Sequence, residues 1–200
     1  MSKILIVAEV KNSEIKKNTL ELISFAKSKG LEMDAVLCGS GVSGQADVLA
    51  GQGASTVYLG DDSSLEIYNT EQYTSLVTDA LQQSGATQVW LSSSELGRDL
   101  TPRVAARQGA GALSDVTQFE VNGDEITAQR PCMSTKVIQK CQFSKDGLRV
   151  ISIRSGFFAP EETSPVPAKT VSLSIPEGHK QLKVKEVQVE VSDERSEEHT

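Results

Sequence analysis

Three glycines in the sequence have the spacing Gly-x-Gly-x-x-Gly, at Gly39, Gly41 and Gly44, and this spacing is typical of a dinucleotide site. In such sites the glycines form a tight turn between a strand and a helix, and the helix N-terminus binds a pyrophosphate. Asp61 and Asp62 follow about twenty residues later, where an acid that binds a ribose is expected. One candidate function is therefore a free-standing nucleotide-binding α/β protein that uses these glycines.

The position of the glycines in the chain argues against a dinucleotide. The fingerprint normally opens the first turn between strand and helix, but that turn here is AEVK, residues 8–11, which contains no glycine. We therefore interpret the glycines as turn geometry, with Gly39 and Gly41 permitting a tight backbone and Gly44 letting a short helix approach the sheet. We interpret the two aspartates as turn-forming and solvated.

The histidines and cysteines argue against several kinds of catalytic and metal site. His179 and His199 are the only histidines, so a Ser-His or Cys-His mechanism in the body of the chain has no base. Cys38, Cys132 and Cys141 form no Cys-x-x-Cys pair, which argues against a disulfide framework and a zinc site. We expect Cys38 to be a buried, inert side chain. The sequence thus argues against histidine-based catalysis and a metal site, whereas paired carboxylates remain possible.

The overall composition limits the partners. A net charge of -7 with no basic concentration argues against nucleic acid. No apolar run approaches the roughly 20 residues of a membrane span, so we expect no membrane insertion. The start of the chain resembles neither a signal peptide nor a transit helix, and a cytoplasmic, bacterial protein is the simplest interpretation.

In the first half of the chain, apolar strands alternate with amphipathic helices. We expect a first helix capped by Asn12 or Ser13 and ended by Gly30, and a later helix that runs from Tyr73 and ends at Gly85. The predicted strands are 3–8, 33–38, 56–59 and 88–91. This order predicts an α/β three-layer sandwich with a mainly parallel, Rossmann-like sheet of the adenine-nucleotide-hydrolase-like type.

The second half shows hairpin signals. Segments 116–121 and 125–129 flank Asn-Gly-Asp, and segments 135–143 and 148–154 flank Lys-Asp-Gly. We expect these hairpins, with further strands at 170–175 and 182–191, to extend the sheet edge in antiparallel fashion.

The last residues, 192–200, are highly charged and show no periodicity, so we expect a disordered tail. Their ending, RSEEHT, resembles the translation of a sequencing-adapter oligonucleotide. A sequencing or assembly artefact is therefore an alternative to a natural tail.

The stretch from Ser92 to Val116 carries the remaining candidate site. A polar loop enters a helix whose N-terminus presents free N–H groups, and Arg98, Asp99 and Arg103 could form an anion or partner contact there. In the alternative interpretation, Asp99 complements the helix dipole, the arginines pair with acids, and Pro102 sits harmlessly in the first turn.

Several motifs together resemble the N-terminal domain of the alpha subunit of electron-transfer flavoproteins. They are GRDLTPRVAAR from Gly97, SDV from Ser114, ILIVAE from Ile4, Gly53-Ala54, Arg130-Pro131 and RSGFF from Arg154. The resemblance covers the chain to about Val191, which predicts one domain over residues 1–191. One departure is MSTK at 133–136, where the family usually has Gly-Lys.

This resemblance implies an electron carrier with no catalytic residues of its own. The intact protein would be a heterodimer with a beta subunit, carry FAD, and pass electrons from acyl-CoA and other dehydrogenases to a quinone oxidoreductase of the respiratory chain, as in fatty acid beta-oxidation. The family's FAD contacts lie mainly in a second domain, whose Gly-rich turn is not found in these residues. We therefore expect this domain to serve subunit assembly and to bind FAD weakly or not at all.

A third hypothesis is a nucleotide-sensing module of the universal-stress type, which has a similar α/β architecture. It requires a Gly-rich phosphate loop after the fourth strand. Residues 92–95, SSSE, place an acid there instead, which makes this hypothesis the weakest of the three.

Overall fold

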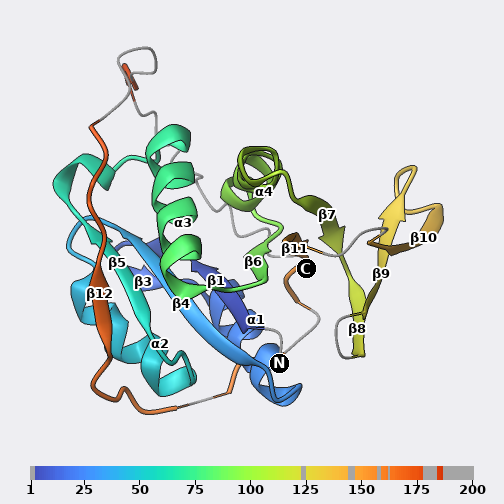
Figure 1. The fold of residues 1–200 in the computed structure, drawn as a ribbon, viewed down its shortest axis with the longest axis horizontal. Helices are drawn as coiled ribbons and strands as arrows, with labels where there is room; N and C mark the ends of the chain where they lie inside the picture. The colour runs from blue at the N-terminus through green and yellow to red at the C-terminus, as the bar shows by residue number, and fades with distance from the viewer. Residues whose placement is uncertain are drawn as a thin grey trace, which may run out of the picture.

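A seven-stranded sheet forms the centre of the protein, here seen in a computed structural model (Figure 1). Its strands, in spatial order, are β12 (Thr170–Ser172), β5 (Val57–Asp61), β4 (Glu32–Gly39), β1 (Lys3–Ala8), β6 (Gln88–Ser92), β11 (Arg149–Ile153) and β7 (Gly111–Val116). All neighbouring pairs in this sheet are parallel. The structure describes residues 3–122, 125–143, 147–156, 159–161, 163–177 and 184–186.

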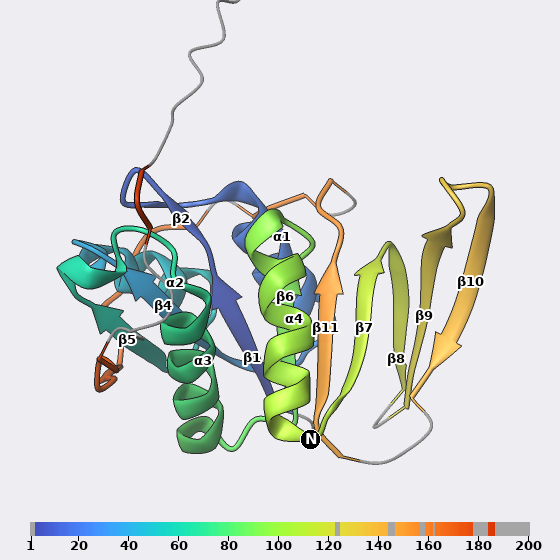
Figure 2. The same cartoon turned by 90° about the horizontal axis from the view of Figure 1, so that it is seen from above.

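Helices cover both faces of the sheet and complete the three layers. In Figure 2, α3 (Thr70–Ser84) and α4 (Glu95–Gln108) lie on the near face, and α1 (Lys17–Ser28) and α2 (Ala46–Gln52) lie behind the sheet. Alternate residues of β1 enter opposite cores: Ile4 and Ile6 pack with α1, whereas Leu5 packs with α3 and α4. A strand buried on both faces reads as a continuous apolar run, and the predicted fold class is confirmed.

Both helices end just before the predicted glycines, Gly30 after α1 and Gly85 after α3, but the predicted N-cap of α1 is not used. Asn69 caps α3 by accepting the N–H of Glu71, and Gly85 ends it at φ +65°. The expected cap of α1 was wrong: Asn12 and Ser13 have φ values of +53° and +61°. They form the turn of a small hairpin between β2 (Val10–Lys11) and β3 (Glu14–Ile15), because a two-residue hairpin turn favours positive φ.

A separate antiparallel sheet follows β7 and projects from the body of the domain (Figures 1 and 2). It consists of β8 (Gln118–Asn122), β9 (Glu125–Cys132) and β10 (Val137–Gln142), and we call it the arm, residues 118–142. The first predicted hairpin, β8 with β9, is confirmed. The base of the arm joins the core through Phe119, whose ring lies 4.9 Å from that of Trp90, centroid to centroid.

The second predicted hairpin was wrong. The strand at 137–142 pairs with β9 in the arm, whereas β11 enters the main sheet in parallel between β6 and β7. All five residues of β11 are buried. An antiparallel edge hairpin would leave one face of β11 in water, so the apolar sequence favours a central parallel position over the local Lys-Asp-Gly turn signal.

The chain after β11 crosses the α1 and α2 face and delivers β12 to the far edge of the sheet. Backbone N–H groups of the crossing segment donate to side chains of this face, from Gly156 to Glu21 at 2.7 Å and from Ala168 to Asp47 at 2.9 Å. β12 confirms a strand within 170–175, but it is parallel to β5 rather than antiparallel.

The remaining C-terminal predictions fall almost entirely outside the described residues. Of the predicted strand at 182–191, residues 184–186 are described and are not in a strand. The two histidines and the tail at 192–200 lie outside the described residues. Within the described part of the chain, no helix has the length and apolar character that crossing a membrane requires.

Candidate functional site

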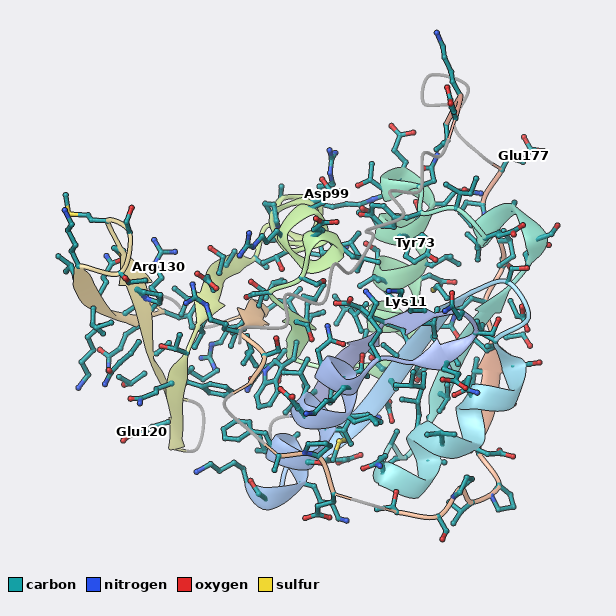
Figure 3. All side chains as sticks on the ribbon, turned by 180° about the vertical axis from the view of Figure 1, so that it is seen from behind. Lys11, Tyr73, Asp99, Glu120, Arg130 and Glu177 are labelled. Carbon is teal, nitrogen blue, oxygen red and sulfur yellow. The ribbon has the colours of Figure 1, made fainter. Side chains whose placement is uncertain are left out.

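A cavity of about 920 Å³ lies at the carboxyl ends of β1, β4 and β6, and we call it the crevice. Its walls come from the end of β1, the β2–β3 hairpin, the glycine turn at 39–44, the loop before α3 and the N-terminus of α4. Lys11 and Tyr73 mark two of its sides in Figure 3. The chain builds β4 and β5 on one side of β1 and β6 on the other, and ligands of open α/β sheets bind where the strand order reverses in this way.

Glu9 is the most buried acid of the crevice, with 2% of its surface exposed. The Nζ atom of Lys16 lies 3.0 Å from one carboxylate oxygen, and the hydroxyl of Ser94 donates to the other at 2.6 Å. The Ser94 hydroxyl also caps α4 by accepting the N–H of Gly97 at 3.1 Å. The carboxylate therefore ties β1 to α4 and has both oxygens in use.

The backbone N–H groups of the glycine turn bind a carboxylate of the same chain, that of Asp61. The N–H groups of Gly41, Val42 and Ser43 donate to the Asp61 carboxylate at 2.6, 3.1 and 2.9 Å. These are the kind of donors with which a dinucleotide-binding turn holds a pyrophosphate. Asp61 therefore takes the place of the phosphate, and the prediction of a merely solvated turn residue was wrong for it.

The individual glycines and Asp62 have simpler roles. Gly41 has φ +66°, and a Cβ atom on Gly39 would lie 2.7 Å from the side chain of Val42, so both positions favour glycine. A Cβ on Gly44 would meet no atom within 4 Å, so the predicted close approach there was wrong. Asp62 is exposed and caps the turn η2 (Ser63–Leu65), and hydrogen bonds from Ser64 lower its pKa.

The structure separates the three predicted site residues on α4: Asp99 and Arg103 form a pair, and Arg98 lies apart from them. Asp99 accepts from Arg103 Nε at 2.9 Å and from the hydroxyl of Tyr68 at 2.7 Å. Burial opposes ionisation of Asp99, but hydrogen bonds from Thr70, Tyr68 and Arg103 hold its pKa below the usual value. Asp99 and Arg103 thus satisfy each other, four residues apart on one helix face.

Arg98 lies apart from that pair. It is exposed, and its charge acts on Asp115 at the end of β7 rather than on Asp99. Pro102 lies in the interior of α4, not in the first turn as expected, and it has no N–H to donate to the Arg98 carbonyl.

Comparison with known proteins identifies the family. The profile described as "Electron transfer flavoprotein domain" matches residues 4–191. The chain belongs to this family. It is 29% identical over 191 residues to "Protein FixB" of Clostridium saccharobutylicum, covering 92% of this chain and 57% of that protein. It is 28% identical over 154 residues to "Electron transfer flavoprotein subunit alpha" of Bacillus subtilis (strain 168), covering 76% of this chain and 47% of that one.

A further relative of this electron transfer flavoprotein domain is named for a reductase complex. It is "Acryloyl-CoA reductase electron transfer subunit beta" of Anaerotignum propionicum, 26% identical over 156 residues, with 76% of this chain and 42% of that one covered. The chain spans about half the length of the relatives it matches.

The described residues of this electron transfer flavoprotein domain do not fit a flavin dinucleotide in the crevice. The N–H donors of the glycine turn are bound to Asp61, and both oxygens of Glu9 have partners. Among the described residues, no group of three histidine, cysteine or acidic side chains is arranged to hold a metal. Burial raises the pKa of the Cys38 thiol to about 12, which agrees with the predicted inert cysteine.

The sequence did not single out Asp115 and Arg154 as a pair, although both lie within motifs of the family. Arg154 Nε donates to Asp115 at 2.9 Å, and the Arg154 Nη2 atom contacts the second carboxylate oxygen. The available signal was the opposite charge of two side chains that both belong to motifs of the family. Using it requires knowing that β7 and β11 lie side by side.

Proposed function

We propose that this chain is the N-terminal domain of an electron-transfer-flavoprotein alpha subunit and that its work is assembly. It pairs with a beta subunit and supports a flavin domain that carries FAD, so the domain has no catalytic residues of its own. The intact protein transfers electrons from acyl-CoA and other dehydrogenases to a quinone oxidoreductase of the respiratory chain, in a route such as fatty acid beta-oxidation. A cytoplasmic location stays a prediction.

The family match carries this proposal, because it spans residues 4–191 and includes relatives named as alpha subunits. The binding of Asp61 to the glycine turn supports an assembly function for this domain, with FAD held by the flavin domain. A domain whose pyrophosphate donors are bound to its own Asp61 is better suited to scaffolding than to holding a redox cofactor. We propose residues 1–191 as the extent of the domain.

The same contacts disfavour the alternative of a free-standing nucleotide-binding protein. That function needs the N–H groups of Gly41 and Ser43 for phosphate and an unoccupied acid for a ribose. The N–H groups are bound to Asp61, and this binding also occupies the acid.

Isothermal titration of the chain with FAD, NAD, ATP and a purified beta subunit of the family from the same organism tests the proposal. We expect binding to the beta subunit and weak or no binding to the three nucleotides. A yellow, stoichiometric FAD complex of this chain would overturn the assembly function. Tight binding of NAD or ATP, without binding to the beta subunit, would establish the nucleotide-binding alternative.

A further inference from the structure

Three arginines from different elements gather at the carboxyl end of β7 and β11, around one aspartate. Arg154 follows β11 and forms a two-pronged contact with Asp115. Arg130 belongs to β9 in the arm, and its Nη1 atom donates to Ser114, the neighbour of Asp115, at 3.3 Å. Arg98, an exposed residue of α4, lies near enough for its charge to lower the pKa of Asp115. We call these four side chains, Arg98, Asp115, Arg130 and Arg154, the arginine edge.

The electrostatic state of Asp115 agrees with this convergence. The hydrogen bond from Arg154 lowers its pKa against the effect of burial, and the charges of Arg154, Arg98 and Arg130 lower it further. One carboxylate is thus bound by one guanidinium group and is influenced by the charges of two more. The arginine edge keeps an excess of positive charge on a chain whose net charge is -7.

The arginine edge is held rigidly. Asp115 has φ +61°, an uncommon backbone conformation for a residue with a side chain. It is fixed there by its N–H, which donates at 3.1 Å to the hydroxyl of the fully buried Ser152, and by Arg154, whose N–H donates to the Val116 carbonyl at 2.8 Å. Strained residues persist only where the surroundings hold them, and they occur often at ligand and partner sites.

Arg130 is also fixed in place, by hydrogen bonds to two neutral side chains. Besides Ser114, it donates through Nε to the side-chain oxygen of Gln139 at 3.1 Å, and both partners are neutral. Its guanidinium therefore lies in a fixed place with its charge not neutralised by these hydrogen bonds. A carboxylate from outside would complete the arrangement, since arginine binds carboxylates by paired hydrogen bonds.

Exposed apolar side chains adjoin these arginines on the arm. Met133, Val137 and Ile138 are exposed by 76%, 46% and 57%. Gln139 lies opposite Arg130, and Val137 lies opposite Cys132, so Val137 shares with Arg130 the same face of the arm. A small anion needs no apolar surface, whereas protein interfaces combine arginine with apolar side chains.

We propose that the arginine edge, with Val137 on the adjoining face of the arm, is the surface that receives the beta subunit. A partner carboxylate binds Arg98 and Arg130, and an apolar side chain of the partner packs on Val137. This inference rests on the proposed function and names the contact surface within it. A protein partner with an acidic side chain is favoured because the arginines keep an excess of positive charge beside the exposed Val137, at the edge of the sheet opposite β12 (Figure 1).

The test compares charge-neutralising variants of the whole chain in binding to the purified beta subunit by calorimetry. Arg98→Gln and Arg130→Gln are each expected to weaken binding about tenfold. Val137→Ser is expected to weaken it less, by about threefold to tenfold. Arg107→Gln is the matched control, because Arg107 lies on the same helix as Arg98, near its other end, and bonds to the neutral Ser75. It is expected to change the affinity less than twofold.

Each outcome decides between the two proposals. If the unchanged chain does not bind the beta subunit, both the assembly function and this surface are overturned. If the chain binds and Arg98→Gln and Arg130→Gln bind equally well with unchanged melting temperatures, only the surface is overturned. Two further results would also overturn it: saturable phosphate binding that both substitutions abolish, or a homodimer of this chain that they dissociate.

Discussion

The crevice and the arginine edge lie at the carboxyl ends of strands in the same sheet, yet they differ in how their charges are satisfied. In the crevice, Glu9 and Asp61 have partners from the chain itself: a lysine, a serine and three backbone N–H groups. At the arginine edge, one aspartate is bound by Arg154 and is also influenced by the charges of Arg98 and Arg130. The crevice has the position of a ligand site, but the uncompensated charge is found at the arginine edge.

This difference shows why position in the fold is a poor guide to function by itself. The reversal of strand order beside β1 creates a hollow in any protein of this architecture, whatever it binds. The side chains that line the hollow determine whether a ligand can bind there. Here Asp61 fills the turn that would otherwise bind phosphate, so the domain keeps the shape of a nucleotide site while its donors serve the fold.

The largest expected effect on stability in this comparison comes from substituting Glu9 in the crevice. Glu9→Ala should lower the free energy of unfolding by about 2–3 kcal/mol, because it removes the buried carboxylate that the half-buried Lys16 and Ser94 share. Urea denaturation with an unchanged m-value measures this loss. Glu66→Ala is the matched control, since Glu66 lines the crevice but is exposed, and it should change stability by less than about 0.5 kcal/mol. Equal effects of the two substitutions would contradict a structural role for Glu9.

Removing the internal anion should convert the glycine turn into a weak external anion site. Asp61→Ala is expected to cost about 1–2 kcal/mol, because three N–H groups lose their acceptor. Inorganic phosphate should then raise the melting temperature of this variant more than that of the unchanged chain. Asp62→Ala, which removes a nearby acid without freeing the turn, should show no such response to phosphate. A phosphate response in neither variant would mean that the turn loses its anion-binding shape without Asp61.

The main sheet and its helices could be predicted because each element carries its signal locally. β1 is a continuous apolar run after Lys3, β6 has an apolar centre at residues 89–91, and α3 has a helical period between Asn69 and Gly85. The place of β11 could not be predicted, because a short turn signal before it favoured a local hairpin. Its actual neighbours, β6 and β7, lie far away along the chain.

The same distinction governs the candidate sites. The Asp99–Arg103 pair follows from an i, i+4 spacing on one helix, which the sequence displays. The Asp115–Arg154 contact joins residues 39 positions apart, and it exists because β7 and β11 pair in parallel. Because that pairing was predicted wrongly, the sequence placed the charged site on α4 alone and missed the two strands and the arm.

A pH titration measures how much the charge of Asp115 at the arginine edge contributes to the stability of the fold. The folded pKa of Asp115 lies below its ordinary value of 3.8, so its ionised form stabilises the fold above that pH. This stabilisation is lost as the pH falls through the folded pKa. Asp115→Asn should therefore cost about 0.5–1 kcal/mol at pH 7, a modest value because the pair is about one-third exposed. The difference between the two proteins should shrink below about pH 4, and urea unfolding across this range measures it. A difference that stays constant with pH would show that Asp115 acts by shape and not by charge.

The smallest effect is expected at Arg103, and it separates the two halves of the predicted trio on α4. Arg103→Gln should leave the affinity for the beta subunit unchanged within twofold, because Arg103 already has Asp99 as its partner. Arg98→Gln removes the same charge from the same helix but from the side that faces Asp115. Calorimetry on the two variants in parallel controls for net charge. If Arg103→Gln weakened binding as much as Arg98→Gln, the partner would respond to the overall charge of α4, and the distinction between the crevice side and the arginine edge would not hold.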